Sequence, residues 1–126
     1  MPVKPRQKRI LIVDDEAIVA FFLMEGLKGL GDEYEVRTTE SAELALEQCS
    51  ATPFDLAVVD YRLPGISGLD LIRQLRDISP DTQTIVITAY SSPELEEQAH
   101  SLRTYRYLAK PFRIQELMHT VEKALA

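Results

Sequence analysis

The sequence has few of the features that point to a disulfide-bonded, metal-thiolate or membrane-spanning protein. It contains one cysteine, Cys49, among 126 residues, which excludes an internal disulfide and a cage of thiolate ligands. Cys49 is therefore expected to fill apolar space. No apolar run approaches the roughly 20 residues of a membrane span. His100 and His119 stand alone on expected helices without a paired ligand, so we assign them no metal-binding role.

Basic charge is also scarce, and this limits the expected partners. The formal net charge is −6, whereas a nucleic-acid surface requires clustered Lys and Arg. We therefore expect no direct nucleic-acid binding by this domain, and no membrane partner. Lys4, Arg6, Lys8 and Arg9 precede the first apolar run without a signal-peptide core between them. Residues 1–8 are expected to form a flexible basic lead-in, and the cytoplasm is the expected location.

The remaining composition fits one compact domain. Hydrophobic residues make up 45% and charged residues 27% of the chain, which is ordinary for a globular protein. A chain of this length can bury about two-thirds of its unfolded surface. We find no repeat, linker or low-complexity stretch, so a single domain over residues 1–126 is expected.

Strand and helix patterns alternate along the chain. Short apolar or alternating runs predict strands, and capped segments with helical spacing predict helices. The expected strands are Arg9–Val13, Tyr34–Thr38, Leu56–Asp60, Thr84–Thr88 and Arg106–Lys110. The expected helices run from about Ala17 to Leu30, from Ser41 to before Pro53, from Ser67 to about Ile78, from Ser92-Pro93 onward, and from Phe112 or Arg113 to the end. Five strands that are each followed by a helix predict an α/β fold with a parallel sheet covered on both faces.

Polar side chains stand where the expected strands end. In an open parallel sheet, the ligand crevice lies at the carboxyl ends of the strands. Asp60 ends the central apolar strand, and the turn with Pro64 and Gly65 after it leaves the carboxylate facing that crevice. The other strand-end residues are Asp14, Asp15, Thr88 and Lys110.

These residue types suit phosphoryl chemistry on one magnesium ion. Mg²⁺ takes oxygen ligands in a tight octahedron, which Asp15 and Asp60 can supply directly and Asp14 through a water. Three converging carboxylates repel one another, and a divalent cation relieves that repulsion. Lys110 can supply positive charge to a phosphoryl group, and Thr88 can donate a hydroxyl hydrogen bond to it.

Each of these residues taken singly has a structural interpretation. An Asp after a strand is often a helix cap, Thr88 is an ordinary strand residue, and Lys110 an ordinary surface lysine. Tyr107 by itself is more often a core aromatic than a switch. The five strand-end polar positions together favour the chemical interpretation.

In ordered combination, four segments resemble the response-regulator receiver domain of two-component signalling, as in chemotaxis regulators. The resemblance covers nearly the whole chain, from about Arg9 to the last helix, and implies a flavodoxin-like fold with strand order 2-1-3-4-5. The matching segments are Val13-Asp14-Asp15-Glu16, Asp60 with Leu63-Pro64-Gly65 and Gly68, Thr88-Ala89, and Tyr107-Leu108-Ala109-Lys110-Pro111-Phe112.

The resemblance implies a role for each residue of the site. Asp60 is the phosphoacceptor, supplied by a histidine kinase or a phosphotransfer protein. Mg²⁺, for which Mn²⁺ can substitute, is held by Asp14, Asp15, Asp60 and the backbone carbonyl of Arg62. Thr88 and Lys110 sense the phosphoryl group, Tyr107 is the aromatic switch, and a cis bond before Pro111 aims Lys110 into the crevice.

The resemblance also implies an output face and a lifetime. The fourth helix, fifth strand and fifth helix are expected to repack on phosphorylation and bind a partner or a second copy. Arg62 and Tyr90 stand two residues after Asp60 and two after Thr88, beside the path of the hydrolytic water. Neither side chain is suited to orient water, and both are bulky, so autodephosphorylation is expected to be slow. The expected chemistry of the domain is limited to Mg²⁺-dependent self-phosphorylation and this slow hydrolysis.

Two other classes of function stay open at this point. A magnesium-dependent phosphohydrolase also uses an aspartyl nucleophile, but its general acid usually stands two residues later, where this chain has Arg62, and the chain lacks a cap domain. A flavodoxin-like binding module would need amide-rich phosphate contacts where the first loop is acidic.

One departure from the family pattern lies before the fifth strand, where the segment Ser101-Leu102-Arg103-Thr104 replaces the Gly-Ala pair of many relatives. The chain is expected to be either a stand-alone receiver or the amino-terminal part of a longer regulator.

Overall fold

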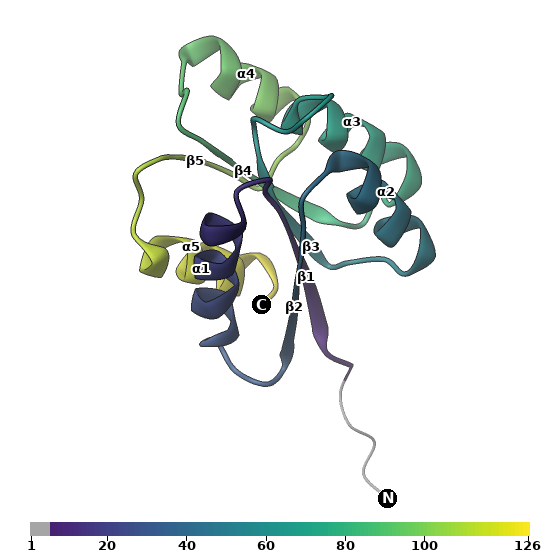
Figure 1. Cartoon of the computed structure of the whole chain (residues 1–126), viewed down its shortest axis with the longest axis vertical. Coiled ribbons are helices and arrows are strands. Elements are labelled where there is room, and N and C mark those ends of the chain that lie inside the picture. Colours follow the sequence, from purple (N-terminus) through teal and green to yellow (C-terminus); the bar gives the residue numbers. More distant parts are fainter. Residues whose placement is uncertain (1–5) are drawn as a thin grey trace, which may run out of the picture.

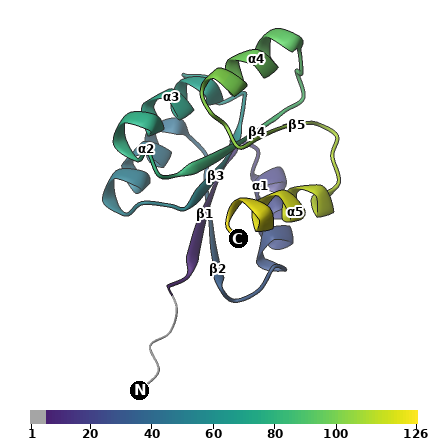
Figure 2. The ribbon, with the colours of Figure 1, turned by 180° about the vertical axis from the view of Figure 1, so that it is seen from behind.

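The structure is a computed structural model that describes residues 6–126, and one parallel sheet forms its centre (Figures 1 and 2). The strands lie in the order β2-β1-β3-β4-β5, which confirms the expected fold and order. They are β1 (Lys8–Val13), β2 (Tyr34–Thr39), β3 (Leu56–Asp60), β4 (Gln83–Thr88) and β5 (Arg106–Ala109). The helices are α1 (Ala17–Lys28), α2 (Ala42–Ala51), α3 (Gly68–Ile78), α4 (Pro93–Ser101) and α5 (Ile114–Ala124).

The expected lead-in over residues 1–8 is wrong at its carboxyl end. Lys8 is the first residue of β1 and pairs with Tyr34 of β2, and its Nζ donates to the carbonyl of Leu125. Arg6 forms an ion pair with Asp55. The strand therefore begins one residue earlier than expected because Lys8 has partners on both sides. The rest of this expectation concerns residues 1–5, which lie outside the described residues.

Most other boundaries fall within one or two residues of expectation. The first helix ends at Lys28 rather than at Leu30, since the N–H of Gly29 closes the last turn on the carbonyls of Gly26 and Leu27. Ser41, Ser67 and Ser92 cap α2, α3 and α4 by accepting backbone N–H bonds. None of the helices in the described part of the chain combines the length and hydropathy needed to cross a bilayer.

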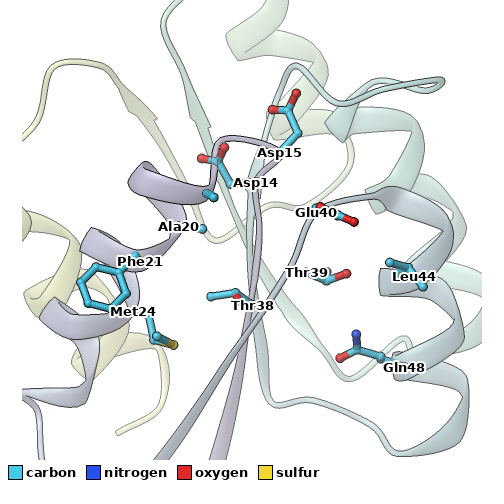
Figure 3. A pocket seen from close by; sticks show the side chains of 11 residues that line it. Asp14, Asp15, Ala20, Phe21, Met24, Thr38, Thr39, Glu40, Leu44 and Gln48 are labelled. Atoms are coloured by element: carbon cyan, nitrogen blue, oxygen red, sulfur yellow. The ribbon is translucent and has the colours of Figure 1, made fainter.

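β3 lies at the centre of the sheet, and all five of its residues are buried. It pairs with β1 on one side and β4 on the other, so both faces need apolar side chains. β2 forms one edge of the sheet, and Figure 3 shows Thr38 and Thr39 of this strand between α1 and α2. The exposed middle of β2, Arg37 and Thr38, agrees with the expectation of a strand near an edge.

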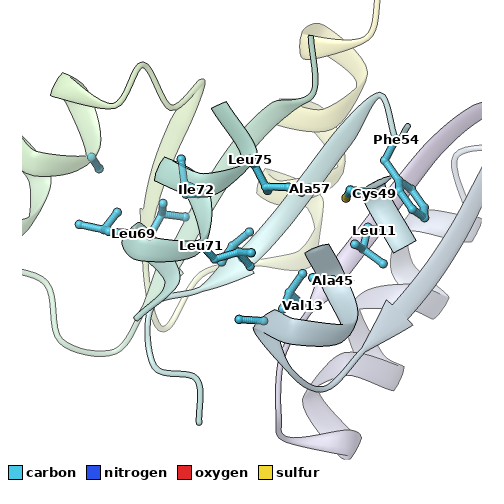
Figure 4. Packing of buried hydrophobic residues seen from close by; sticks show 14 of the residues in the cluster. Leu11, Val13, Ala45, Cys49, Phe54, Ala57, Leu69, Leu71, Ile72 and Leu75 are labelled. Atoms are coloured by element: carbon cyan, nitrogen blue, oxygen red, sulfur yellow. The ribbon is translucent and has the colours of Figure 1, made fainter. Parts of the chain in front are cut away.

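The sheet divides the apolar core into two clusters. Successive strand residues point to opposite faces, so Leu11 and Val59 pack under α2, α3 and α4 (Figure 4), whereas Ile12 and Val58 pack against α1 and α5. Each fully buried aliphatic side chain contributes about 1.5–3 kcal/mol. Cys49 is a free, buried thiol in the first cluster, as expected of an apolar filler.

Candidate functional site

The carboxyl ends of β1 and β3 bring three acidic side chains together. One carboxylate oxygen from each of Asp14, Asp15 and Asp60 lies within 4.8 Å of the others. Lys110, just after β5, places its Nζ 3.4 Å from Asp60 Oδ2. The crevice beside them has a volume of about 410 Å³ and is lined by Asp15, Glu16, Asp60, Arg62, Leu63, Pro64, Ala89, Tyr90 and Lys110.

Local hydrogen bonds fix the two strand ends that carry the buried acids. Asp14 Oδ1 accepts the N–H of Glu16 at 2.9 Å, and Asp60 Oδ1 accepts the N–H of Arg62 at 3.3 Å. The N–H of Gly68 donates to the carbonyl of Tyr61 at 2.7 Å, which holds the start of α3 against the end of β3. A Cβ at Gly68 would lie 2.4 Å from the carbonyl oxygen of Asp60, so this close approach requires glycine.

Burial raises the pKa values of both interior carboxyls. The pKa of Asp14 rises from 3.8 to about 6, chiefly because burial disfavours its charged form, while the N–H of Glu16 opposes the shift and the nearby Asp60 adds to it. Burial also raises the pKa of Asp60, against the lowering effect of Lys110. Lys110 therefore offsets only part of the cost of burying these two charges.

The donor set fits a hard divalent cation. Within residues 6–126, the buried Oδ2 of Asp14 has no hydrogen-bond partner. Asp15 is exposed beside it, so the cluster is open to solvent on one side. Carboxylate and carbonyl oxygens around an open position are the ligands that Mg²⁺ takes, with water completing its octahedron.

Thr88 ends β4, and Lys110, which lines the crevice, follows β5. The N–H of Lys110 donates to the carbonyl of Thr88 at 2.7 Å, and the Lys110–Pro111 bond is cis, as the resemblance implied. Thr88 is buried, and its Oγ1 accepts the N–H of Tyr90 at 2.9 Å. Its hydroxyl proton can still be donated to another acceptor.

Of the three other side chains predicted from the resemblance, Arg62 and Tyr90 line the crevice and Tyr107 does not. The guanidinium of Arg62 stands 4.0 Å from the ring centroid of Tyr90, so the two side chains form a stacked pair at the mouth of the crevice. Tyr107 packs against the cluster under α2, α3 and α4, and among the described residues its buried hydroxyl has no partner. Glu16 also lines the crevice. It lies in the segment Val13-Asp14-Asp15-Glu16, but no sequence pattern indicated a role for it.

Comparison with known proteins identifies the class to which this fold and crevice belong. The family model of the response regulator receiver domain matches residues 10–122, and the chain belongs to that family. It is a receiver domain of two-component response regulators, a signalling module rather than a classical enzyme. Receiver domains bind Mg²⁺ at an acidic pocket and interact with histidine kinases or phosphotransfer proteins. The phosphohydrolase and flavodoxin-like interpretations are not favoured.

Individual relatives differ in how much of their length the chain covers. The response regulator receiver protein CpdR of Brucella abortus is 30% identical over 94% of this chain and 97% of its own length. The transcriptional regulatory protein ZraR of Escherichia coli is 35% identical over 93% of this chain but only 26% of its own length. The crystal structure of TrrA from Thermotoga maritima, in complex with Mg²⁺-BeF, is 36% identical, with a TM-score of 0.82 over 94% of this chain and 99% of that one.

Proposed function

We propose that this receiver accepts a phosphoryl group on Asp60 from the phosphohistidine of a histidine kinase or phosphotransfer protein. The observation that carries the proposal is the convergence of Asp14, Asp15 and Asp60 within 4.8 Å, with Lys110 3.4 Å from Asp60. A bound divalent cation would neutralise the developing charge on the phosphoryl oxygens. Asp14, Asp15, Asp60 and the Arg62 carbonyl would hold it, and Mn²⁺ would substitute for Mg²⁺ because both take oxygen ligands.

The chain's own contribution is position and charge. A carboxylate oxygen of Asp60 attacks phosphorus as the P–N bond to the donor imidazole breaks, and the electron pair of that bond returns to the imidazole nitrogen. The ammonium group of Lys110 stabilises the negative charge that develops on the phosphoryl oxygens, and Thr88 can turn its hydroxyl toward one of them. The product is a mixed anhydride on Asp60, and the same site later hydrolyses it.

A wider proposal covers the setting of this reaction. The chain acts as a single receiver domain in the cytoplasm, with protein partners rather than nucleic acid, and phosphorylation makes the face of α4, β5 and α5 bind a partner or a second copy. The family match over residues 10–122 supports one domain. The net charge of −6 supports protein partners.

The test is phosphorylation by acetyl phosphate in the presence of Mg²⁺, followed by intact-protein mass spectrometry. The wild type should gain one phosphoryl group, and Asp60→Asn should gain none, because the substitution removes the nucleophile. Asp81→Asn, which changes an exposed aspartate in a turn, is the matched control and should behave as wild type. The proposal fails if Asp60→Asn is labelled at the wild-type level or if EDTA leaves labelling unchanged.

A further inference from the structure

The outer edge of β2 carries backbone groups that are free to pair with another strand. Among residues 6–126, β2 pairs only with β1. The N–H of Lys8 donates to the carbonyl of Glu33, and the N–H of Asp14 to that of Thr39. The odd-numbered residues of β2 therefore bond inward, and by the period of two the N–H and C=O of Val36 and Thr38 point outward. Such an edge is a template for a further strand.

A groove lined by both polar and apolar side chains runs along this edge. It has a volume of about 460 Å³ and lies between α1 and α2, with Thr38 at its floor (Figure 3). Phe21 and Met24 of α1 form one wall, and Leu44 of α2 lies on the other. Phe21 is 60% exposed and Leu44 42% exposed. These side chains would lose apolar surface to water if a second element covered the edge.

The charges on β2 favour a second copy of the strand as the occupant, although within one chain Glu35 already accepts hydrogen bonds from Arg9 and Arg37. Glu35 and Arg37 lie on one face of the strand, two residues apart, and flank Val36. In an antiparallel pair of two β2 strands centred on Val36, each Glu35 lies directly opposite Arg37 of the other copy. Opposite charges at such cross-strand positions stabilise the pair. The strand is therefore complementary to itself in this one register.

The same register satisfies the backbone and the helices. Val36 would exchange both of its backbone hydrogen bonds with Val36 of the second copy, as the central pair of a two-fold interface does. A two-fold axis perpendicular to the sheet keeps both α1 helices on one face and both α2 helices on the other. Phe21 and Met24 of the two copies would then cover one another across the axis.

We propose that two copies of this chain associate through antiparallel pairing of β2, which makes one continuous sheet with α1 packed against α1. The interface lies on the opposite edge of the sheet from β5 and contains neither Asp60 nor Lys110, although Asp14 and Asp15 line the far end of the same groove. Association therefore does not require phosphorylation. This separates it from the output-face contact of the proposed function.

The test is sedimentation equilibrium of the unphosphorylated full chain over about 5 to 500 µM. One strand pair and a few apolar side chains make a small interface, so a Kd of the order of 10–100 µM is expected. The mass should rise with concentration from the 14.3 kDa of one chain toward twice that value. Hydrogen exchange at the amides of Val36 and Thr38 should slow over the same range. A chain that stays monomeric at the highest concentration would overturn the proposal.

Two matched pairs of variants test the register and the apolar wall. Arg37→Glu places like charges opposite each other at both ends of the pair and should weaken association at least ten-fold. Arg73→Glu changes an arginine of the same exposure, 60% against 59%, that is also paired with an acid, and should not weaken association.

Phe21→Glu should likewise weaken association, whereas Phe22→Glu, at 59% exposure against 60%, should not. Thermal melts confirm that each variant is folded. If Arg37→Glu and Phe21→Glu both associate as strongly as the wild type, the copies meet elsewhere. The same conclusion follows if hydrogen exchange slows on β5 instead of β2.

Discussion

At the scale of single residues, Asp14 determines how the site responds to protons and cations. Its side chain is buried beside Asp60, and its pKa is raised to about 6. A carboxyl whose pKa is higher in the folded state than in the unfolded chain loses relative stability as pH rises between the two values. The penalty is absent below pH 3.8 and complete above about pH 6.

We therefore expect Asp14→Asn to stabilise the metal-free protein at pH 8 and to have little effect near pH 4. A shift of about two pKa units corresponds to about 2–3 kcal/mol, and the amide keeps an oxygen for the N–H of Glu16. Urea unfolding in EDTA at both pH values measures the difference, with Asp81→Asn as the control for a lost exposed charge. Equal stability of Asp14→Asn and wild type at pH 8 would contradict this account of the buried charge. Added Mg²⁺ should stabilise the wild type more than the variant.

We propose that the stack of Arg62 on Tyr90 limits how water reaches a phosphoryl group on Asp60. The two side chains lie over the mouth of the crevice, and neither orients or deprotonates water near neutral pH. Arg62→Asn combined with Tyr90→Glu should speed autodephosphorylation by about ten-fold, which is about 1.4 kcal/mol of barrier. The measurement is the decay of phosphorylated protein after the donor is removed, with Arg73→Asn as the control. Fast decay in the wild type, or no change in the double variant, would show that these positions do not control the rate.

At the scale of elements, the connection from α4 to β5 depends on one strained residue and one half-buried arginine. Arg103 has φ of 61°, a left-handed conformation that costs a non-glycine residue about 1–2 kcal/mol. Arg76 of α3 donates to the carbonyls of Leu102 and Arg103 and to Thr84 Oγ1. Burial and the nearby Arg103 lower the pKa of Arg76. The connection is thus held by hydrogen bonds that compensate for its strain.

Arg103→Gly should raise the free energy of unfolding by about 1 kcal/mol, because glycine adopts this φ without a clash. Arg103→Ala removes the same charge but keeps the clash, so it separates strain from charge repulsion and should give a smaller gain or none. Denaturant unfolding at neutral pH measures both variants. Equal gains in Gly and Ala would assign the effect to charge.

The elements themselves were predictable from sequence, but their tertiary supports were not. Apolar runs and capping serines located the strands and helices within one or two residues, because those signals are local. The strand-end carboxylates could be brought together because parallel strands end at one edge of the sheet. The contact of Arg76 with Arg103 spans 27 residues, and the stack of Arg62 on Tyr90 depends on two side-chain rotamers. No local pattern encodes either contact.

At the scale of the molecule, we propose that the site communicates with the α4–β5 face through Thr88 and Tyr107. Thr88 pairs with Ala109 at the end of β5, and Tyr107 lines a hollow of about 680 Å³ between α4 and β5. A Thr88 hydroxyl that turns toward a phosphoryl group would vacate space that the Tyr107 ring can enter. The hollow would then change shape at a distance from Asp60.

Beryllofluoride with Mg²⁺, which the relative TrrA binds, is a suitable probe of this coupling. Amide chemical shifts should change most around Asp60 and along α4, β5 and α5. Tyr107→Phe should preserve this response, since among the described residues the hydroxyl has no partner, whereas Tyr107→Ala should reduce it. Shifts confined to α1 and α2 would argue against the coupling.

The division of the core by the sheet has a consequence for how the chain can vary. Leu75 and Ala99 lie in one cluster, and Leu27 and Leu117 lie in the other. A substitution in one cluster therefore does not alter the packing partners of a residue in the other. Effects of distant substitutions without shared partners usually add within about 0.3–0.5 kcal/mol. Lineages can therefore exchange the packing beneath α1 and α5 without compensating changes beneath α2, α3 and α4. Substitutions in the strands, whose side chains point into both clusters, are the ones that must remain compatible with the packing on both sides of the sheet.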